Sequence, residues 1–292
     1  MGRTGRKKNR KTFAIIVILA AAFLAAAVIF FCRVSIKNYF EEKTRQATLP
    51  PAKSYSEVKD LPSSGETSEN KIEFEDILII GNEDGEEANT NETGTADNVP
   101  GRVLPAEFNL AVPFTSQAPF AVWDEIHEDA CEEASVMMID AFFTNRNFTA
   151  QSADDEIFSI VDWETKTFGY WLDTTAEETA QILREKYGYQ NVRVVYDIGI
   201  NDIKREVAMG RPVILPAAGQ LLGNIYFQQP GPLYHMLVVR GWTKEGMIIT
   251  NDPGTKRGEG YLYEPDVLIN AVHDWSGGDV ENGRKAMIVV EK

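Results

Sequence analysis

The 292-residue chain has few of the residues that build a disulfide framework or a structural metal site. It contains two cysteines, Cys32 and Cys131, and three histidines. Cys32 lies in an apolar run near the N-terminus, so Cys131 has no disulfide partner in the rest of the chain. The histidines have no cysteine or carboxylate partner at the spacing of a zinc ligand set. We therefore expect no metal and no cofactor.

Basic residues are also scarce. The chain has 29 Lys and Arg against 44 Asp and Glu, which gives a formal net charge of -15. Residues 54–100 alone hold thirteen acidic residues and two lysines. No basic patch marks a nucleic-acid surface, and the acidity points to solubility instead. The Gly-x-Ser-x-Gly pattern of a serine nucleophile is missing as well.

The N-terminal region has the pattern of a membrane anchor. Residues 1–12 form a basic tail without an acid, and residues 13–32 are an uncharged apolar run of 20 residues. A helix of that length spans about 30 Å, the thickness of a bilayer's hydrocarbon core. The basic tail predicts a cytoplasmic N-terminus and an extracytoplasmic C-terminal region at the cell membrane. A cleaved signal peptide is the competing interpretation, but the run ends in bulky residues at the expected cleavage position.

The remaining chain divides into a linker and a domain. Residues 33–103 are predicted to be an acidic flexible linker, because such a composition buries too little apolar surface to offset chain entropy. Residues 104–292 are apolar and aromatic enough for one folded domain. The periodicity predicts helices first and a mostly antiparallel sheet afterwards, which indicates an α+β domain. Expected helices cover 131–143, 175–187, 201–209 and 264–273, and expected strands cover 213–216, 235–240, 247–250 and 285–290.

Three residues stand in the order of a papain-type nucleophile, base and orienter. Cys131 opens an apolar helical stretch, His235 begins an apolar strand, and Asp252 lies in an Asn-Asp-Pro-Gly turn after the next strand. A helix N-terminus and a neighbouring imidazole both favour a thiolate. Gln117 precedes the cysteine and is the candidate oxyanion donor, together with the backbone N–H of Cys131.

Each signal has an ordinary structural interpretation. A lone cysteine is usually a small core residue, a histidine that opens a strand is usually structural, and Asn-Asp-Pro-Gly is a common turn sequence. Their order and the element types that carry them favour the catalytic interpretation. His127, four residues before Cys131, is expected in a loop or in a supporting position behind the site, and His273 is expected at a helix end.

A family resemblance rests on four short segments, 112–117, 131–135, 234–241 and 251–254. Together they resemble the papain-like bacterial cysteine peptidases of family C thirty-nine, the bacteriocin-processing type that acts on double-glycine leaders. The similarity covers roughly residues 110–290. It implies a papain-like fold with Cys131 as nucleophile, His235 as base, Asp252 as its orienter and Gln117 as oxyanion donor.

The chain departs from that family in two respects. Glu132 and Glu133 stand where the common pattern has Gly-Pro, and two carboxylates beside the sulfur disfavour a thiolate. The predicted anchor also places the domain outside the cell, whereas transporter-linked members cut leaders on the cytoplasmic side.

The expected function is a membrane-anchored, extracytoplasmic cysteine peptidase that acts on a peptide or protein substrate. Two alternatives remain open: a non-catalytic papain-fold module that binds a surface, and an amidase or transpeptidase acting on cell-wall peptides. Residues 219–232 are expected to form a substrate-facing loop or a plain surface loop. Trp123, Trp171 and Trp242 are expected either in the wall of the cleft or in the core.

Overall fold

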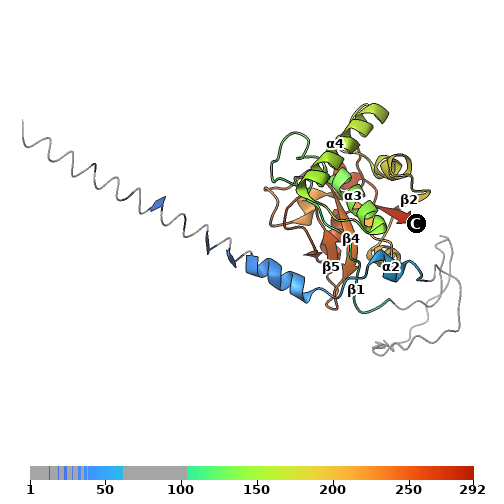
Figure 1. Ribbon diagram of the computed structural model, residues 1–292, viewed down its shortest axis with the longest axis horizontal. Helices are drawn as coiled ribbons and strands as arrows, with labels where there is room; N and C mark the ends of the chain where they lie inside the picture. Colours follow the sequence, from blue (N-terminus) through green and yellow to red (C-terminus); the bar gives the residue numbers. More distant parts are fainter. Residues whose placement is uncertain are drawn as a thin grey trace, which may run out of the picture. The chain divides into compact units, whose positions relative to one another are not determined.

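The computed structural model describes residues 39–61 and 104–292, together with residues 13, 19, 23, 24, 28, 32, 33, 36 and 37. It divides into two units, Met1–Leu49 and Pro50–Lys292, whose elements are shown in Figure 1. In the first unit, residues 39–48 are helical. The predicted basic tail and most of the predicted span at 13–32 lie outside the described residues. Among the helices that are described, none has both the length and the apolar composition of a membrane span.

The second unit is built around an antiparallel sheet. Its described part has seven strands in the order β2-β7-β3-β4-β5-β6, and β1 also pairs with β4. Every residue of β3 and β4 is buried, so both faces of the sheet centre are covered. The strands are β1 (Phe108–Asn109), β2 (Asn191–Tyr196), β3 (Val213–Ala218), β4 (Tyr234–Trp242), β5 (Ile248–Asn251), β6 (Tyr261–Tyr263) and β7 (Ala286–Glu291).

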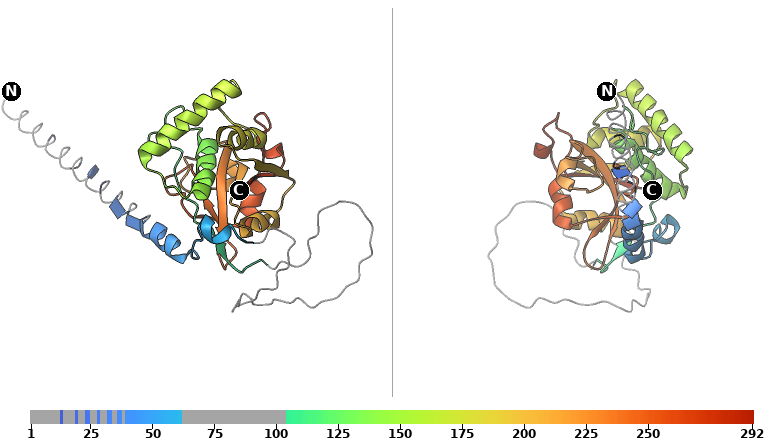
Figure 2. Two further views of the ribbon diagram at one scale, coloured as in Figure 1. Left: turned by 45° about the vertical axis from the view of Figure 1, so that its right-hand side comes forward. Right: turned by 90° about the vertical axis from the view of Figure 1, so that its left-hand side faces the viewer.

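Helices cover this sheet. In the right-hand view of Figure 2, the green helices α3 and α4 lie together on one side of the orange strands. α3 is buried along nearly its whole length because it is apolar on almost all sides and packs on β3 and β4. The helical elements are α2 (Tyr55–Val58), α3 (Cys131–Thr144), α4 (Ala150–Thr167), α5 (Ala176–Gln181), η1 (Ile182–Lys186), α6 (Ile200–Ala208), η2 (Gly219–Leu222), α7 (Pro265–Ala271) and η3 (Val280–Asn282).

The predicted α+β class with an antiparallel sheet is confirmed. The four expected helices correspond to α3, α5 with η1, α6 and α7, and the four expected strands correspond to β3, β4, β5 and β7. Helix α4 was not predicted, although Ala153, Ile157, Ile160 and Val161 form a buried stripe at helical spacing. Thr149 caps this helix by accepting a hydrogen bond from the backbone of Ser152.

The domain begins earlier than predicted. Residues 50–61 belong to the same compact unit as residues 104–292, so the expected linker at 33–103 is wrong for this stretch. The Lys53 backbone exchanges hydrogen bonds with the segment that carries β1. The Tyr55 ring packs edge-on against Phe142 and Phe143, and Val58 is only 1% exposed. A few apolar side chains hold this segment against the domain. The neighbouring acidic residues dominate the composition, so these apolar residues do not stand out in the sequence. Residues 62–103 lie outside the described residues.

Replacing Val58 with aspartate tests this boundary. A charge at a buried site is costly, so Val58→Asp should lower the free energy of unfolding by about 2–4 kcal/mol. The matched control, Lys59→Asp, changes an exposed position and should stay within about 0.5 kcal/mol of wild type. Urea denaturation of a fragment beginning at residue 39, followed by tryptophan fluorescence, measures both. Equal stability of the two variants would contradict the docking of this segment.

Candidate active site

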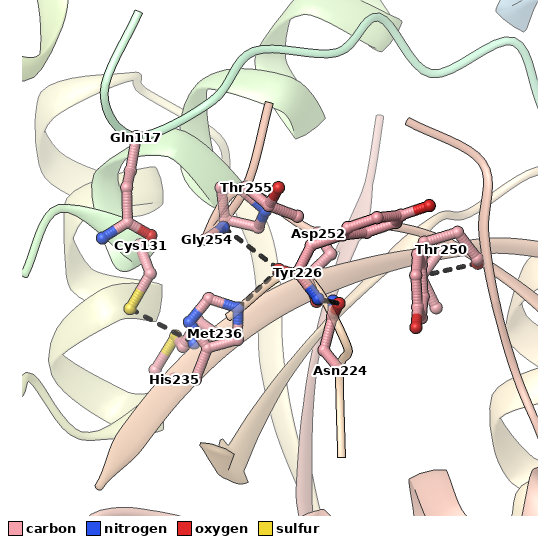
Figure 3. A network of polar contacts seen from close by, with 12 residues as sticks. Gln117, Cys131, Asn224, Tyr226, His235, Met236, Thr250, Asp252, Gly254 and Thr255 are labelled. Atoms are coloured by element: carbon pink, nitrogen blue, oxygen red, sulfur yellow. Dashed lines mark hydrogen bonds and ion pairs between the residues drawn. The ribbon is translucent and has the colours of Figure 1, made fainter. Parts of the chain in front are cut away.

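Cys131 is the first residue of α3, and its sulfur meets the opening of β4. The Met236 backbone N–H donates to the Cys131 Sγ at 3.3 Å, although the two residues lie 105 positions apart. The first turn of a helix also has backbone N–H groups without a partner inside the helix. The structure therefore brings the predicted nucleophile to the strand that carries His235, as Figure 3 shows.

The pairing of β4 with β5 brings His235 and Asp252 together. Val238 pairs with Asn251, so the next residue, Asp252, falls opposite Leu237, which shares a sheet face with His235. The His235 Nε2 lies 2.8 Å from the Asp252 Oδ1, and both side chains are buried. The Nδ1 of the ring is therefore not the atom that contacts Asp252. Figure 3 shows the His235 ring lying between Asp252 and Cys131.

Asp252 accepts hydrogen bonds from several donors. Its Oδ2 accepts from the Tyr263 hydroxyl at 2.6 Å and from the Asn224 amide at 2.9 Å, while the Gly254 N–H donates to Oδ1 at 3.0 Å. Burial alone would raise the pKa of Asp252, but the charge of His235 and these hydrogen bonds lower it below its ordinary value. Asp252 is thereby held as a carboxylate.

The loop before β4 covers the other edge of the His235 ring. The Phe227 ring packs edge-on against it, with centroids 5.2 Å apart. A Cβ atom at Gly254 would come within 2.9 Å of the His235 ring and 2.8 Å of Phe227, so only glycine fits between them. Residues 226–232 of the expected substrate-facing loop line the cleft.

Gln117 lines the cleft beside Cys131, but its carboxamide is already engaged. Its Nε2 donates to the backbone oxygens of His127 at 3.0 Å and Glu128 at 2.9 Å. Among the described residues its Oε1, which is buried, has no hydrogen-bond partner. The backbone N–H of Gln117 donates to the Pro253 oxygen, which ties this segment to the turn that follows Asp252.

The thiol itself is bound to an acid. Its Sγ donates to the Glu132 Oε2 at 2.9 Å, and both residues are buried. Burial raises the pKa of the Cys131 thiol well above its usual value, and the charge and hydrogen bond of Glu132 raise it further. The Met236 N–H acts in the opposite direction. The resting structure thus favours the thiol form.

Two further carboxyl groups near this site are buried in the protein. Glu133 on α3 and Glu164 on α4 are fully buried, and their four carboxyl oxygens have no hydrogen-bond partner in the described part of the chain. Burial and the charge of Glu164 raise the pKa of Glu133. Burial and the charges of Glu132 and Glu178 raise the pKa of Glu164 to about 8. At neutral pH Glu164 is therefore mostly protonated.

Cys131 and His235 line one cleft of about 670 Å³. Its lining includes the acids Glu128, Asp129 and Asp173 and the cationic Lys256. Among the described residues, no group of three or more His, Cys, Asp or Glu side chains has the arrangement of a metal site. The remaining lining residues named so far are Gln117, Cys131, Glu132, Phe227, His235 and Gly254.

The other expected site residues divide between the cleft and the core. Trp123 lines the cleft and is exposed. Trp242 is buried in a stack with Phe108, and Trp171 packs against the core, so neither forms the wall. His127 is held between Asp124 at 2.7 Å and Asp154 at 3.0 Å, and the His273 ring binds the backbone of Gly283.

Comparison with known proteins finds a matching family model. Residues 109–275, more than half of the chain, match the model of the Peptidase_C39 like family. A crystal structure described as a C39-like peptidase from Bacillus anthracis is similar at 14% identity and a TM-score of 0.39, over 62% of this chain and 95% of that one. A fragment of Prevotella intermedia prointerpain A is similar at 16% identity and a TM-score of 0.27, over 38% of this chain and 31% of that one. No curated protein matches the chain.

The pH dependence of stability tests the buried carboxyl pair. Because the pKa of Glu164 is raised to about 8 on folding, its contribution is fully present below the unfolded value near 4.3 and is lost as the pH rises through about 8. Glu164→Gln removes the group that causes this loss. Wild type should therefore lose about 2–4 kcal/mol more of its free energy of unfolding between pH 5 and pH 8.5 than the variant does. Asp155→Asn, on the exposed face of the same helix, should leave the wild-type profile unchanged.

Proposed function

The chain belongs to the Peptidase_C39 like family, and on this premise we propose that it hydrolyses peptide or amide bonds as a cysteine peptidase. The observation that carries the proposal is the convergence of three residues at one cleft. The Asp252 carboxylate lies 2.8 Å from the Nε2 of His235, and the next residue of the same strand donates its N–H to the Cys131 Sγ. This arrangement supplies a nucleophile, a base and an orienting acid.

The proposed reaction begins when the Cys131 proton moves to the Nδ1 of His235. The thiolate attacks the substrate carbonyl carbon, and the carbonyl oxygen becomes an oxyanion. The imidazolium then gives its proton to the leaving amine, which leaves a thioester on Cys131. His235 next takes a proton from water, whose oxygen attacks the thioester and releases the acid product. Asp252 holds the ring in one orientation and stabilises its positive form.

The oxyanion needs donors, and the proposed ones are the backbone N–H of Cys131 and the Nε2 of Gln117. Because that Nε2 now bonds the oxygens of His127 and Glu128, one of these bonds has to be released or shared when substrate binds. The N–H of Cys131 has no partner within its helix, because it begins α3.

A non-catalytic binding module is the second candidate. The observation that favours it is the environment of the sulfur, since burial and Glu132 raise the pKa of the Cys131 thiol. A thiol that stays protonated is a poor nucleophile. Such a protein would keep the cleft and bind a peptide there without cutting it.

Substitution of the nucleophile and the base separates these candidates. Cys131→Ala and His235→Asn should each lower the hydrolysis rate by at least about a thousandfold, because both act in the same chemical step. His273→Asn, which changes a histidine bonded to Gly283, should retain wild-type activity. The substrates are an unfolded protein and peptidoglycan fragments, with products read by mass spectrometry. Cleavage of wall fragments alone would identify a cell-wall amidase, and binding without any cleavage would identify the non-catalytic module.

The proposal includes anchoring at the cell membrane through residues 13–32, with the domain outside the cell. The support is the uncharged apolar run and the basic tail that precedes it. The full chain should therefore stay with the membrane fraction after an alkaline carbonate wash, and a variant lacking residues 1–32 should not. Protease added to intact cells should digest the domain of the full chain. Protection of the domain until the cells are lysed would contradict the orientation.

A further inference from the structure

The proton of the Cys131 thiol points at Glu132 in the resting structure. The Sγ donates to the Glu132 Oε2 at 2.9 Å, while the Nε2 of His235 is engaged with Asp252. Glu132 is 1% exposed, so water does not compete for this contact. The carboxyl next to the nucleophile is therefore part of the site's hydrogen bonding and not a solvated acid at a helix end.

Glu132 has no cationic partner among the described residues. The groups that face it from α3 are the Cys131 thiol and Glu133, and Glu164 faces it from α4. Asp173 acts on it from the segment between α4 and α5. On β4, the Tyr234 hydroxyl interacts with it electrostatically, and His235 lines the same cleft. His235 is the one group of this set that can carry positive charge.

We propose that Glu132 is a positioning residue that acts through Cys131, holding the proton on the sulfur as a carboxylate and stabilising the thiolate once it is itself protonated. This inference rests on the proposed function. The contact at 2.9 Å can be made in either direction. A carboxylate accepts S–H from the thiol, and a neutral carboxyl donates O–H to a thiolate. Peptide hydrolysis then depends on the protonation of a buried group beside the nucleophile.

The proton balance gives the direction of the pH dependence. With Glu132 ionised, the resting site holds a thiol, an imidazole and a carboxylate, with a sum of -1 for the three groups. The reactive site holds a thiolate, an imidazolium and a neutral Glu132, with a sum of zero. One proton is taken up between these states, and the thiol's own proton moves to His235. Lower pH therefore favours the reactive state, until Asp252 is protonated and no longer supports the imidazolium.

Alkylation of Cys131 by iodoacetamide measures the thiolate without any substrate. The full-length chain in detergent is labelled between pH 5 and pH 8, and the Cys131 peptide is quantified by mass spectrometry. In wild type the rate should fall about tenfold from pH 5 to pH 7.5, because the contacting carboxyl gains charge as the pH rises. An ordinary thiol shows the opposite trend, since its thiolate fraction rises with pH.

Glu132→Gln keeps the shape of the side chain and can donate N–H to a thiolate at any pH. We expect its alkylation rate at pH 7.5 to be about tenfold above wild type, with little change from pH 5 to pH 7.5. Glu132→Asp keeps a carboxyl and should keep the acid-favoured profile. Asp155→Asn removes an exposed charge on α4, away from the cleft, and should follow wild type.

The outcomes that overturn the inference are distinct from failure of the proposed function. A wild-type rate that is flat or rises from pH 5 to pH 7.5 rejects it, whether or not any variant folds. A Glu132→Gln profile that is lower at every pH but unchanged in shape rejects it also, because that is the result of a merely structural role. If the profiles are as expected but no peptide is cleaved, the coupling of Glu132 to Cys131 stands and the peptidase proposal fails.

Discussion

One hydrogen bond joins the two parts of the site, from the Met236 backbone to the Cys131 sulfur. It fixes the first turn of α3 against the start of β4, and the neighbouring residue in that strand is His235. The pairing of β4 with β5 then sets where Asp252 lies. A shift of one residue in that pairing would turn the aspartate to the opposite face of the sheet. The alignment of the sulfur with His235 and Asp252 therefore depends on the register of the sheet.

The carboxyls beneath the sulfur work against the stability of the fold. Acids in the first turn of a helix are usually favourable, because they face the positive end of its dipole in water. Glu132 and Glu133 occupy such positions but are buried, so desolvation exceeds that gain and the raised pKa of each carboxyl expresses the cost. Uncompensated acids of this kind are typical of functional sites and rare in ordinary cores.

Local sequence patterns predicted the site residues that lie within a recognisable helix start, strand or turn. The order of Cys131, His235 and Asp252 and the elements that carry them followed from apolar periodicity and turn residues. Asn224 and Tyr263 could not be predicted as partners of Asp252, because a loop and an edge strand bring them there through long-range pairing. The contact between the sulfur and Glu132 depends on a side-chain rotamer, which no sequence pattern specifies.

The start of the domain was predicted too late for a different reason. Composition is an average over many residues, and the apolar side chains of Tyr55, Val58 and Leu61 are outnumbered by the acids around them.

The early start of the domain has a consequence for the covalent continuity of the protein. Leu61 and Leu104 both pack on the core of the same unit, on either side of residues 62–103. A chain cleaved anywhere in that interval would remain a complex of two fragments. The piece carrying Tyr55 and Val58 would stay bound as a small subunit, held by non-covalent contacts such as ring packing and backbone pairing.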